Sequence, residues 1–231
     1  MTALTPPSVQ AMFAEALRHH EAERQVEAER LYRQILQLDP HHPDALHMYG
    51  VLYLQVGRPD IAVDLIAKAI AQKDRVPAFH SHLGYALQLL GNLTDAAAAY
   101  GRVLALQQDD VEAHYNLGIL LQAQGEAVKA AASYQRALAH RPDFAEAYCN
   151  LGNALQEQGK STEAVAAYEQ ALIHKPDYAE AFCNRGNALQ AQGDPDAAIV
   201  SLERALVLNA HLAGAQCSER RFDGIACRSP R

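Results

Sequence analysis

Small and bulky apolar residues occupy fixed positions in a pattern that repeats every thirty-four residues along this chain. The stretch AEAYCNLGNALQEQG at 145–159 returns as AEAFCNRGNALQAQG at 179–193 with three substitutions. Counted in this register, six units without insertion or deletion start at Val9 and end at residue 212. In every unit positions 8 and 20 are small, position 24 is large, and position 28 is Leu or Ile. This rule predicts that one helix packs closely against another.

Each unit is predicted to contain two helices of about a dozen residues. Glycines such as Gly159 at position 15 are typical of the end of a first helix, and prolines such as Pro176 at position 32 precede the next unit. Leu151 and Leu155 share one face of a first helix, and Tyr168 lies on the answering face of a second. A helix pair this short cannot bury its apolar face alone, so the pairs must stack. We expect an all-α fold, a right-handed α-solenoid (superhelix).

The expected domain organisation follows the repeat from end to end. We expect a disordered tail at 1–8 and a degenerate partial seventh repeat, or a C-terminal tail, at 213–231. In that last segment Ala213, Ala215 and Cys217 keep positions 1, 3 and 5 before the pattern is lost. We therefore expect the apolar face of the sixth unit to be completed by self-association into a homo-oligomer, or by further sequence in a longer protein. The six repeats are predicted at 9–42, 43–76, 77–110, 111–144, 145–178 and 179–212.

This pattern resembles the tetratricopeptide repeat family over residues 9–212. Stretches such as NLGNALQEQGKSTEAVAAYEQALIHKPDY look most like the repeats found ahead of the catalytic domain in O-linked N-acetylglucosamine transferases and their bacterial relatives. The resemblance implies that the first helices line the concave face of a superhelix with positions 2, 5, 6, 9, 12 and 13. In the transferases, asparagines at position 6 form a ladder that holds substrate peptides, and Asn116, Asn150 and Asn184 match that position.

Amide side chains form a predicted polar strip on the first helices. A primary amide offers a donor and an acceptor, the two groups that a peptide unit needs. The strip therefore suits an extended peptide of little sequence preference, and we expect its asparagines to face solvent in the free protein. The alternative is that these are tolerated, solvated residues of a repeat consensus. The strip consists of Asn116, Asn150, Asn153, Asn184, Asn187, Gln122, Gln156 and Gln190.

The groove is predicted to differ between its two halves and to exclude acidic ligands. The amino-terminal half is apolar, as an anchor pocket would be, unless the tail at 1–8 covers it. No Lys or Arg occupies an inner position, which argues against a carboxylate ligand. Glu112, Glu146 and Glu180 at position 2 favour neutral or basic partner segments. The residues of the predicted anchor pocket are Phe13, Leu17, Met48, Val51 and Tyr85.

Composition and motifs exclude several classes of function. A net charge of −7 and a pI near 5.8 argue against nucleic acid and anionic membranes as partners. No signal peptide and no apolar run of about twenty residues is found, so a cytoplasmic location is expected. The eleven histidines lack metal-ligand spacing, and His80 and His114 are expected to pack between helices. With no nucleophile or nucleotide motif either, we expect no metal, no cofactor and no enzymatic activity in this chain.

Two functions remain open from the sequence. The chain is either a scaffold or adaptor that binds a peptide segment of a partner protein in its groove, or the substrate-selecting arm of a glycosyltransferase whose catalytic domain lies outside this chain.

Overall fold

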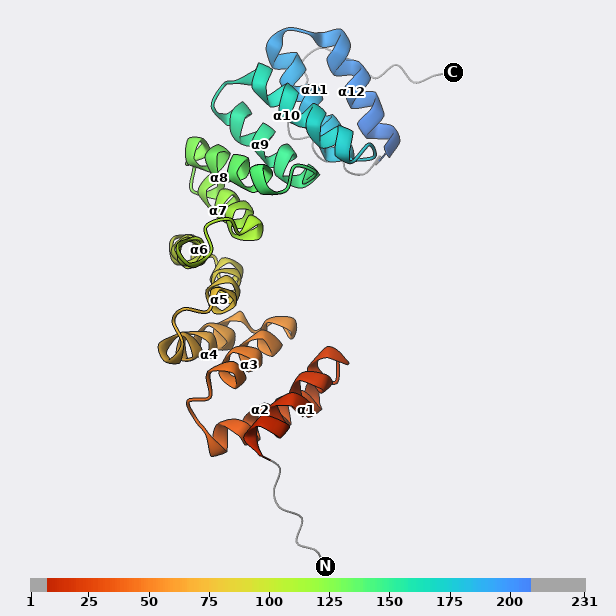
Figure 1. Cartoon of the computed structure of the whole chain (residues 1–231). Coiled ribbons are helices and arrows are strands. Elements are labelled where there is room, and N and C mark those ends of the chain that lie inside the picture. Colours follow the sequence, from red (N-terminus) through yellow and green to blue (C-terminus); the bar gives the residue numbers. More distant parts are fainter. Residues whose placement is uncertain (1–7, 209–231) are drawn as a thin grey trace, which may run out of the picture. The chain divides into compact units, whose positions relative to one another are not determined.

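The computed structural model describes residues 8–208, and all of its regular structure in that range is α-helical (Figure 1). The predicted fold class, an all-α solenoid of helix-turn-helix repeats, is confirmed. Residues 1–7 of the predicted tail and the whole of the segment 213–231 lie outside the described residues. The helices of the described range are α1 (Val9–Glu21), α2 (Gln25–Leu38), α3 (Pro43–Gln55), α4 (Pro59–Gln72), α5 (Pro77–Leu89), α6 (Leu93–Leu106), α7 (Val111–Ala123), α8 (Ala127–His140), α9 (Ala145–Glu157), α10 (Ser161–His174), α11 (Ala179–Gln192) and α12 (Pro195–Leu208).

Backbone contacts divide the chain into two compact units, with the division between Leu120 and Leu121 inside α7. The first unit contains α1 to α6 and most of α7, and the second contains the end of α7 and α8 to α12. Within each unit, consecutive helices pack side by side, as α3 with α4 and α9 with α10 (Figure 1). In the second unit α11 also contacts α9, so first helices of successive repeats are neighbours.

Glycine ends the first helix of most repeats through a left-handed turn. Gly57 has φ +73°, and its N–H donates to the carbonyl oxygen of Leu54 at 3.1 Å. The next N–H, that of Arg58, donates to Tyr53 at 2.8 Å, so carbonyls at the helix end are satisfied. In the first repeat Glu23 takes this conformation with φ +56°, a position where a side chain is disfavoured.

Close packing of position 8 against position 24 holds each helix pair together. The rings of Tyr32, Tyr100, Tyr134 and Tyr168 are fully buried. A Cβ placed on Gly84 would lie 2.9 Å from the Tyr100 ring, and one on Gly50 would lie 2.6 Å from Ile66. These distances are shorter than van der Waals contact, so the bulky residue fits only because the facing residue has no side chain. The predicted packing rule and the predicted phase of the second helices are confirmed.

The last described helix differs from the earlier second helices at position 28. Leu138 and Leu172 are 8% and 9% exposed, because the following first helix covers them. Leu206, the equivalent residue of α12, is 47% exposed. An apolar contact that the earlier repeats make is therefore largely open at the end of the described chain.

The glycine rule can be tested with two Gly→Ala substitutions. Gly152→Ala would press a Cβ into the buried Tyr168 ring, so we expect it to lower the free energy of unfolding by about 1–3 kcal/mol. Gly101→Ala on α6 is the matched control, since its Cβ would meet nothing within 4 Å. Alanine is the better helix former, so the control should raise stability by up to about 1 kcal/mol. Urea unfolding followed by circular dichroism measures both, and equal effects would contradict the packing rule.

Candidate functional site

Asn153 and Asn184, two members of the predicted strip, come together in the second unit. Asn153 lies on α9 and Asn184 on α11. The Asn184 Nδ2 group donates a hydrogen bond to Asn153 Oδ1 at 3.0 Å, across two successive repeats. The same oxygen accepts a second hydrogen bond from the Tyr168 hydroxyl at 2.7 Å. Asn184 Nδ2 also lies 3.9 Å from the sulfur of the buried Cys149. These amides are therefore tied into the fold as well as facing its surface.

Gln122 is held in a similar way near the start of the second unit. Its Oε1 atom accepts a hydrogen bond from the Tyr134 hydroxyl at 3.0 Å. Its Nε2 atom donates to Glu157 Oε1 at 2.6 Å, which links the end of α7 to the end of α9. A buried tyrosine thus reaches a first-helix amide in two different repeats.

The other strip residues are less exposed than the sequence suggests. Asn116 on α7, in the first unit, is half-buried, as are Asn150, Asn187 and Gln156 in the second, whereas Gln190 is exposed. The Oε1 atom of Gln156 is buried and accepts no hydrogen bond within the described range 8–208. The asparagines of the strip are thus partly exposed, neither fully solvated nor buried. Peptide binding by the strip remains a prediction.

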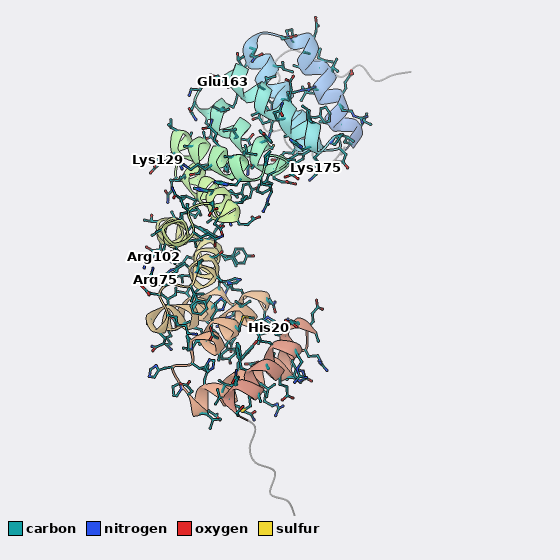
Figure 2. The ribbon with its side chains drawn as sticks, viewed as in Figure 1. His20, Arg75, Arg102, Lys129, Glu163 and Lys175 are labelled. Carbon is teal, nitrogen blue, oxygen red and sulfur yellow. The ribbon has the colours of Figure 1, made fainter. Side chains whose placement is uncertain are left out.

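Two acidic residues at position 2, Glu146 and Asp44, are paired within their own repeats. Lys175, labelled in Figure 2, donates to Glu146 Oε1 at 3.0 Å, and this contact lowers the pKa of the Glu146 carboxyl. Lys73 and Asp44 form the equivalent ion pair in the second repeat at 2.8 Å. Lys175 lies twenty-nine residues beyond Glu146 in the chain, so the pair cannot be recognised from neighbouring residues in the sequence. The negative charge on this edge is therefore smaller than predicted.

The predicted apolar residues lie on the first helices of the first unit. Phe13 and Met48 pack against a buried cluster that contains Tyr32, and the Phe13 and Tyr32 rings lie 6.4 Å apart. Leu17 and Val51 are half-buried on α1 and α3. Tyr85 on α5 is 48% exposed. Leu89, four residues further on the same helix, is 50% exposed and was missed, although its spacing from Tyr85 places both on one face.

A histidine pair that the sequence did not reveal joins α3 to α5. His47 Nε2 lies 2.9 Å from His82 Nδ1, and His82 Nδ1 lies 3.0 Å from the carbonyl oxygen of Ala78. Burial, followed by the nearby His82, lowers the pKa of His47 to about 4, and burial also lowers the pKa of His82. His80 and His114 are buried, in line with the expectation that they pack between helices, and the structure adds that each bonds a backbone carbonyl. Among residues 8–208 no three potential ligands gather around a metal position.

Family models and solved structures agree on the type of repeat. Models described as "TPR repeat" match residues 84–125, 123–159 and 152–193, and models described as "Tetratricopeptide repeat" match 19–84 and 179–212. No curated protein sequence matches the chain. No helix in the described part of the chain is both long and apolar enough to cross a membrane.

Solved structures with the same fold include those of MamA, YrrB and PilF. A crystal structure of MamA is 26% identical, with a TM-score of 0.68, and the match covers 71% of this chain and 96% of MamA. YrrB, a TPR protein with an unusual peptide-binding site, is 17% identical with a TM-score of 0.71 over 82% of this chain and 98% of YrrB. PilF of Pseudomonas aeruginosa is 16% identical with a TM-score of 0.74 over 92% of this chain and 97% of PilF. The last two likenesses show the fold alone.

Because of the His47–His82 pair, we predict that the protein becomes less stable as the pH is lowered. In the folded state the pKa of His47 is about 4, below its ordinary 6.5, so the unfolded chain takes up protons first. The contribution of neutral His47 to the free energy of unfolding is fully present above about pH 6.5 and is lost as the pH falls toward about 4. With an allowance for screening by solvent, the loss is about 2 kcal/mol.

Urea unfolding at pH 7 and pH 4.5 measures this dependence. His47→Phe should flatten the pH dependence of the free energy of unfolding, because Phe cannot be protonated. His41→Gln, a change at an exposed histidine, should leave it as in the parent protein. A parent-like slope in His47→Phe would mean that other groups cause the acid sensitivity.

Proposed function

The chain belongs to the tetratricopeptide repeat family, and we propose that it is a non-catalytic scaffold that holds an extended segment of a partner protein on the first-helix face of its repeats. The proposal fits a chain whose described residues are helix pairs of this family throughout. It also fits the general use of such stacked repeats as surfaces for protein segments.

One observation carries the proposal: amides of successive repeats stand next to each other on the first-helix face. Asn153 and Asn184, from consecutive repeats, are joined by a hydrogen bond of 3.0 Å. First helices of neighbouring repeats lie about 10 Å apart, and an extended chain rises about 3.3 Å per residue. Successive repeats would therefore meet the backbone of an extended ligand at intervals of about three ligand residues. Amide groups at this spacing match a ligand read mainly by its backbone.

The charges next to the strip favour a neutral or basic segment over an acidic one. Glu157 and Glu180 border the strip, while Lys175 is occupied by Glu146. An acidic ligand would find no unpaired cation on the inner positions, which hold neither Lys nor Arg. Because Glu146 is neutralised, the preference for basic over neutral segments is weaker than the sequence indicates.

The apolar first helices of the first unit are proposed to hold an apolar side chain of the same class of partner. Tyr85 and Leu89 are each about half exposed on one face of α5, and Val51 lies on the neighbouring α3. Exposed apolar groups of this kind gain free energy when a partner removes them from water. A cytoplasmic location suits such a scaffold and stays part of the proposal.

The exposed Leu206 supports a proposal of self-association through the last described helix. Its equivalents Leu138 and Leu172 are covered by a following first helix, so a second copy of the chain could supply the missing contact. Light scattering at increasing protein concentration tests this.

A second candidate function is the substrate-selecting arm of a glycosyltransferase. It is favoured by Asn116, Asn150 and Asn184, which occupy position 6 in three successive repeats, as in the asparagine ladder of those enzymes. The matches found in the comparisons concern tetratricopeptide repeats in general, so this narrower resemblance ranks second. Transferase activity of the intact gene product would favour it.

The scaffold proposal predicts the effect of replacing Asn116, Asn150 and Asn184 together by Ala. We expect binding of a neutral, end-capped Ala/Ser/Thr peptide of about twelve residues to weaken about tenfold or more, since each lost hydrogen bond costs about 1 kcal/mol. Fluorescence anisotropy measures the affinity, and thermal melting checks the fold. Gln135→Ala with Gln170→Ala, two exposed amides on second helices, is the control and should change neither.

Two results would count against the strip. A large drop in melting temperature of the triple variant would mean that the asparagines are structural. Unchanged stability together with unchanged peptide binding would mean that they are tolerated residues of a repeat consensus.

A further inference from the structure

Buried tyrosines of the second helices reach polar groups on the first-helix face of the same repeat. The Tyr168 hydroxyl lies 2.7 Å from Asn153 Oδ1, and the Tyr134 hydroxyl lies 3.0 Å from Gln122 Oε1. In the first repeat the Tyr32 hydroxyl lies 3.1 Å from Nδ1 of His20, which is labelled in Figure 2. All three tyrosines occupy position 24, with their rings fully buried. The contact therefore recurs in three repeats; its partners Asn153 and Gln122 are half-buried, whereas His20 is buried.

At Asn153 this contact engages the oxygen of the amide. The Oδ1 atom accepts from both Tyr168 and Asn184, so its two lone pairs are occupied. The Nδ2 group of Asn153 donates to no residue in the range that the structure describes. What Asn153 offers to a ligand is therefore a donor.

Gln122 likewise offers a donor to a ligand. Its oxygen accepts from Tyr134, and its nitrogen donates one hydrogen bond to Glu157. An amide nitrogen carries two N–H groups, so one donor of Gln122 is left over. At both positions the tyrosine uses the acceptor and leaves a donor.

We propose that Tyr168 and Tyr134 are positioning residues of the peptide-binding strip, which orient Asn153 and Gln122 so that these amides donate to backbone carbonyl oxygens of the bound segment. This inference rests on the scaffold function proposed above and adds the polarity of recognition. It also restricts the ligand, because an extended segment has unpaired carbonyls, whereas most carbonyls of a helix are occupied within the helix.

Packing alone does not explain the hydroxyl groups. In the second repeat position 24 is Ile66, and the first-helix positions 9 and 12 hold Val51 and Leu54, which offer nothing to a hydroxyl. Ile66 is as fully buried as Tyr168, so an apolar residue fills the same place in the core. A phenolic hydroxyl that reaches neither water nor a protein partner costs free energy, and Tyr134 and Tyr168 have protein partners on the proposed binding strip.

Tyrosine-to-phenylalanine substitutions test the proposal, because they keep the ring and remove only the hydroxyl. We expect Tyr168→Phe to weaken binding of the neutral Ala/Ser/Thr peptide about threefold to tenfold in fluorescence anisotropy, and Tyr134→Phe to weaken it in the same sense. Tyr100→Phe is the matched control: Tyr100 occupies position 24, its ring is buried, and its hydroxyl bonds no residue of the described range. The control should leave the affinity unchanged.

A second measurement needs no ligand. Side-chain amide signals in 15N NMR report how fast the Asn153 NH2 group rotates and exchanges with water. In Tyr168→Phe these rates should rise, and in Tyr100→Phe they should stay as in the parent protein. Unchanged Asn153 rates in Tyr168→Phe would overturn the positioning role whether or not the peptide binds.

The two measurements separate this inference from the proposed function. If the parent protein does not bind the peptide, the scaffold proposal fails, and the claim that these tyrosines serve a binding strip is overturned with it. If the Asn116, Asn150 and Asn184 triple variant loses binding while Tyr168→Phe binds as the parent does, the scaffold stands and the positioning role is refuted.

Discussion

The structure depends on the close approach of two helices at one point of each repeat, where a bulky residue at position 24 meets a small residue at position 8. Tyr100 against Gly84 and Ile66 against Gly50 show how little space is left, since any added Cβ would lie within 3 Å of the facing side chain. Because interiors are packed to the density of organic crystals, this contact fixes the distance between the two helices. The left-handed glycine turn that follows the first helix then returns the chain at that distance.

The same contact determines what reaches the first-helix face. The Tyr168 ring faces Gly152, and its hydroxyl bonds Asn153 on the first helix; the buried Tyr134 bonds Gln122 in the same way. In the described residues a tyrosine at position 24 makes such a contact in the first, fourth and fifth repeats. Ion pairs also recur at equivalent positions: Lys175 pairs with Glu146, and Lys73 pairs with Asp44. The surface chemistry of the repeats is thus a consequence of their core.

Much of the fold could be predicted from the sequence because the repeat makes local patterns agree with one another. Helix pairs, the glycine turns and the buried phase of Tyr168 all follow from residue size and spacing. The hydrogen bond from Tyr168 to Asn153 and the contact of His47 with His82 could not be read in this way. They depend on side-chain rotamers of residues that are fifteen and thirty-five positions apart, on separate helices. The half-buried state of the asparagines could not be read from the sequence either, because the exposure of a side chain depends on how the helices pack.

The most direct test of the account is to observe the amide side chains of the strip by 15N NMR while the neutral Ala/Ser/Thr peptide is titrated into the parent protein. We predict that the NH2 signals of Asn153, Asn184 and Asn187 shift progressively with peptide concentration. The exposed amides of Gln135 and Gln170 on the second helices should not shift. Shifts confined to Gln135 and Gln170, or a strip that stays unchanged at saturating peptide, would contradict a partner-binding role for the first-helix face.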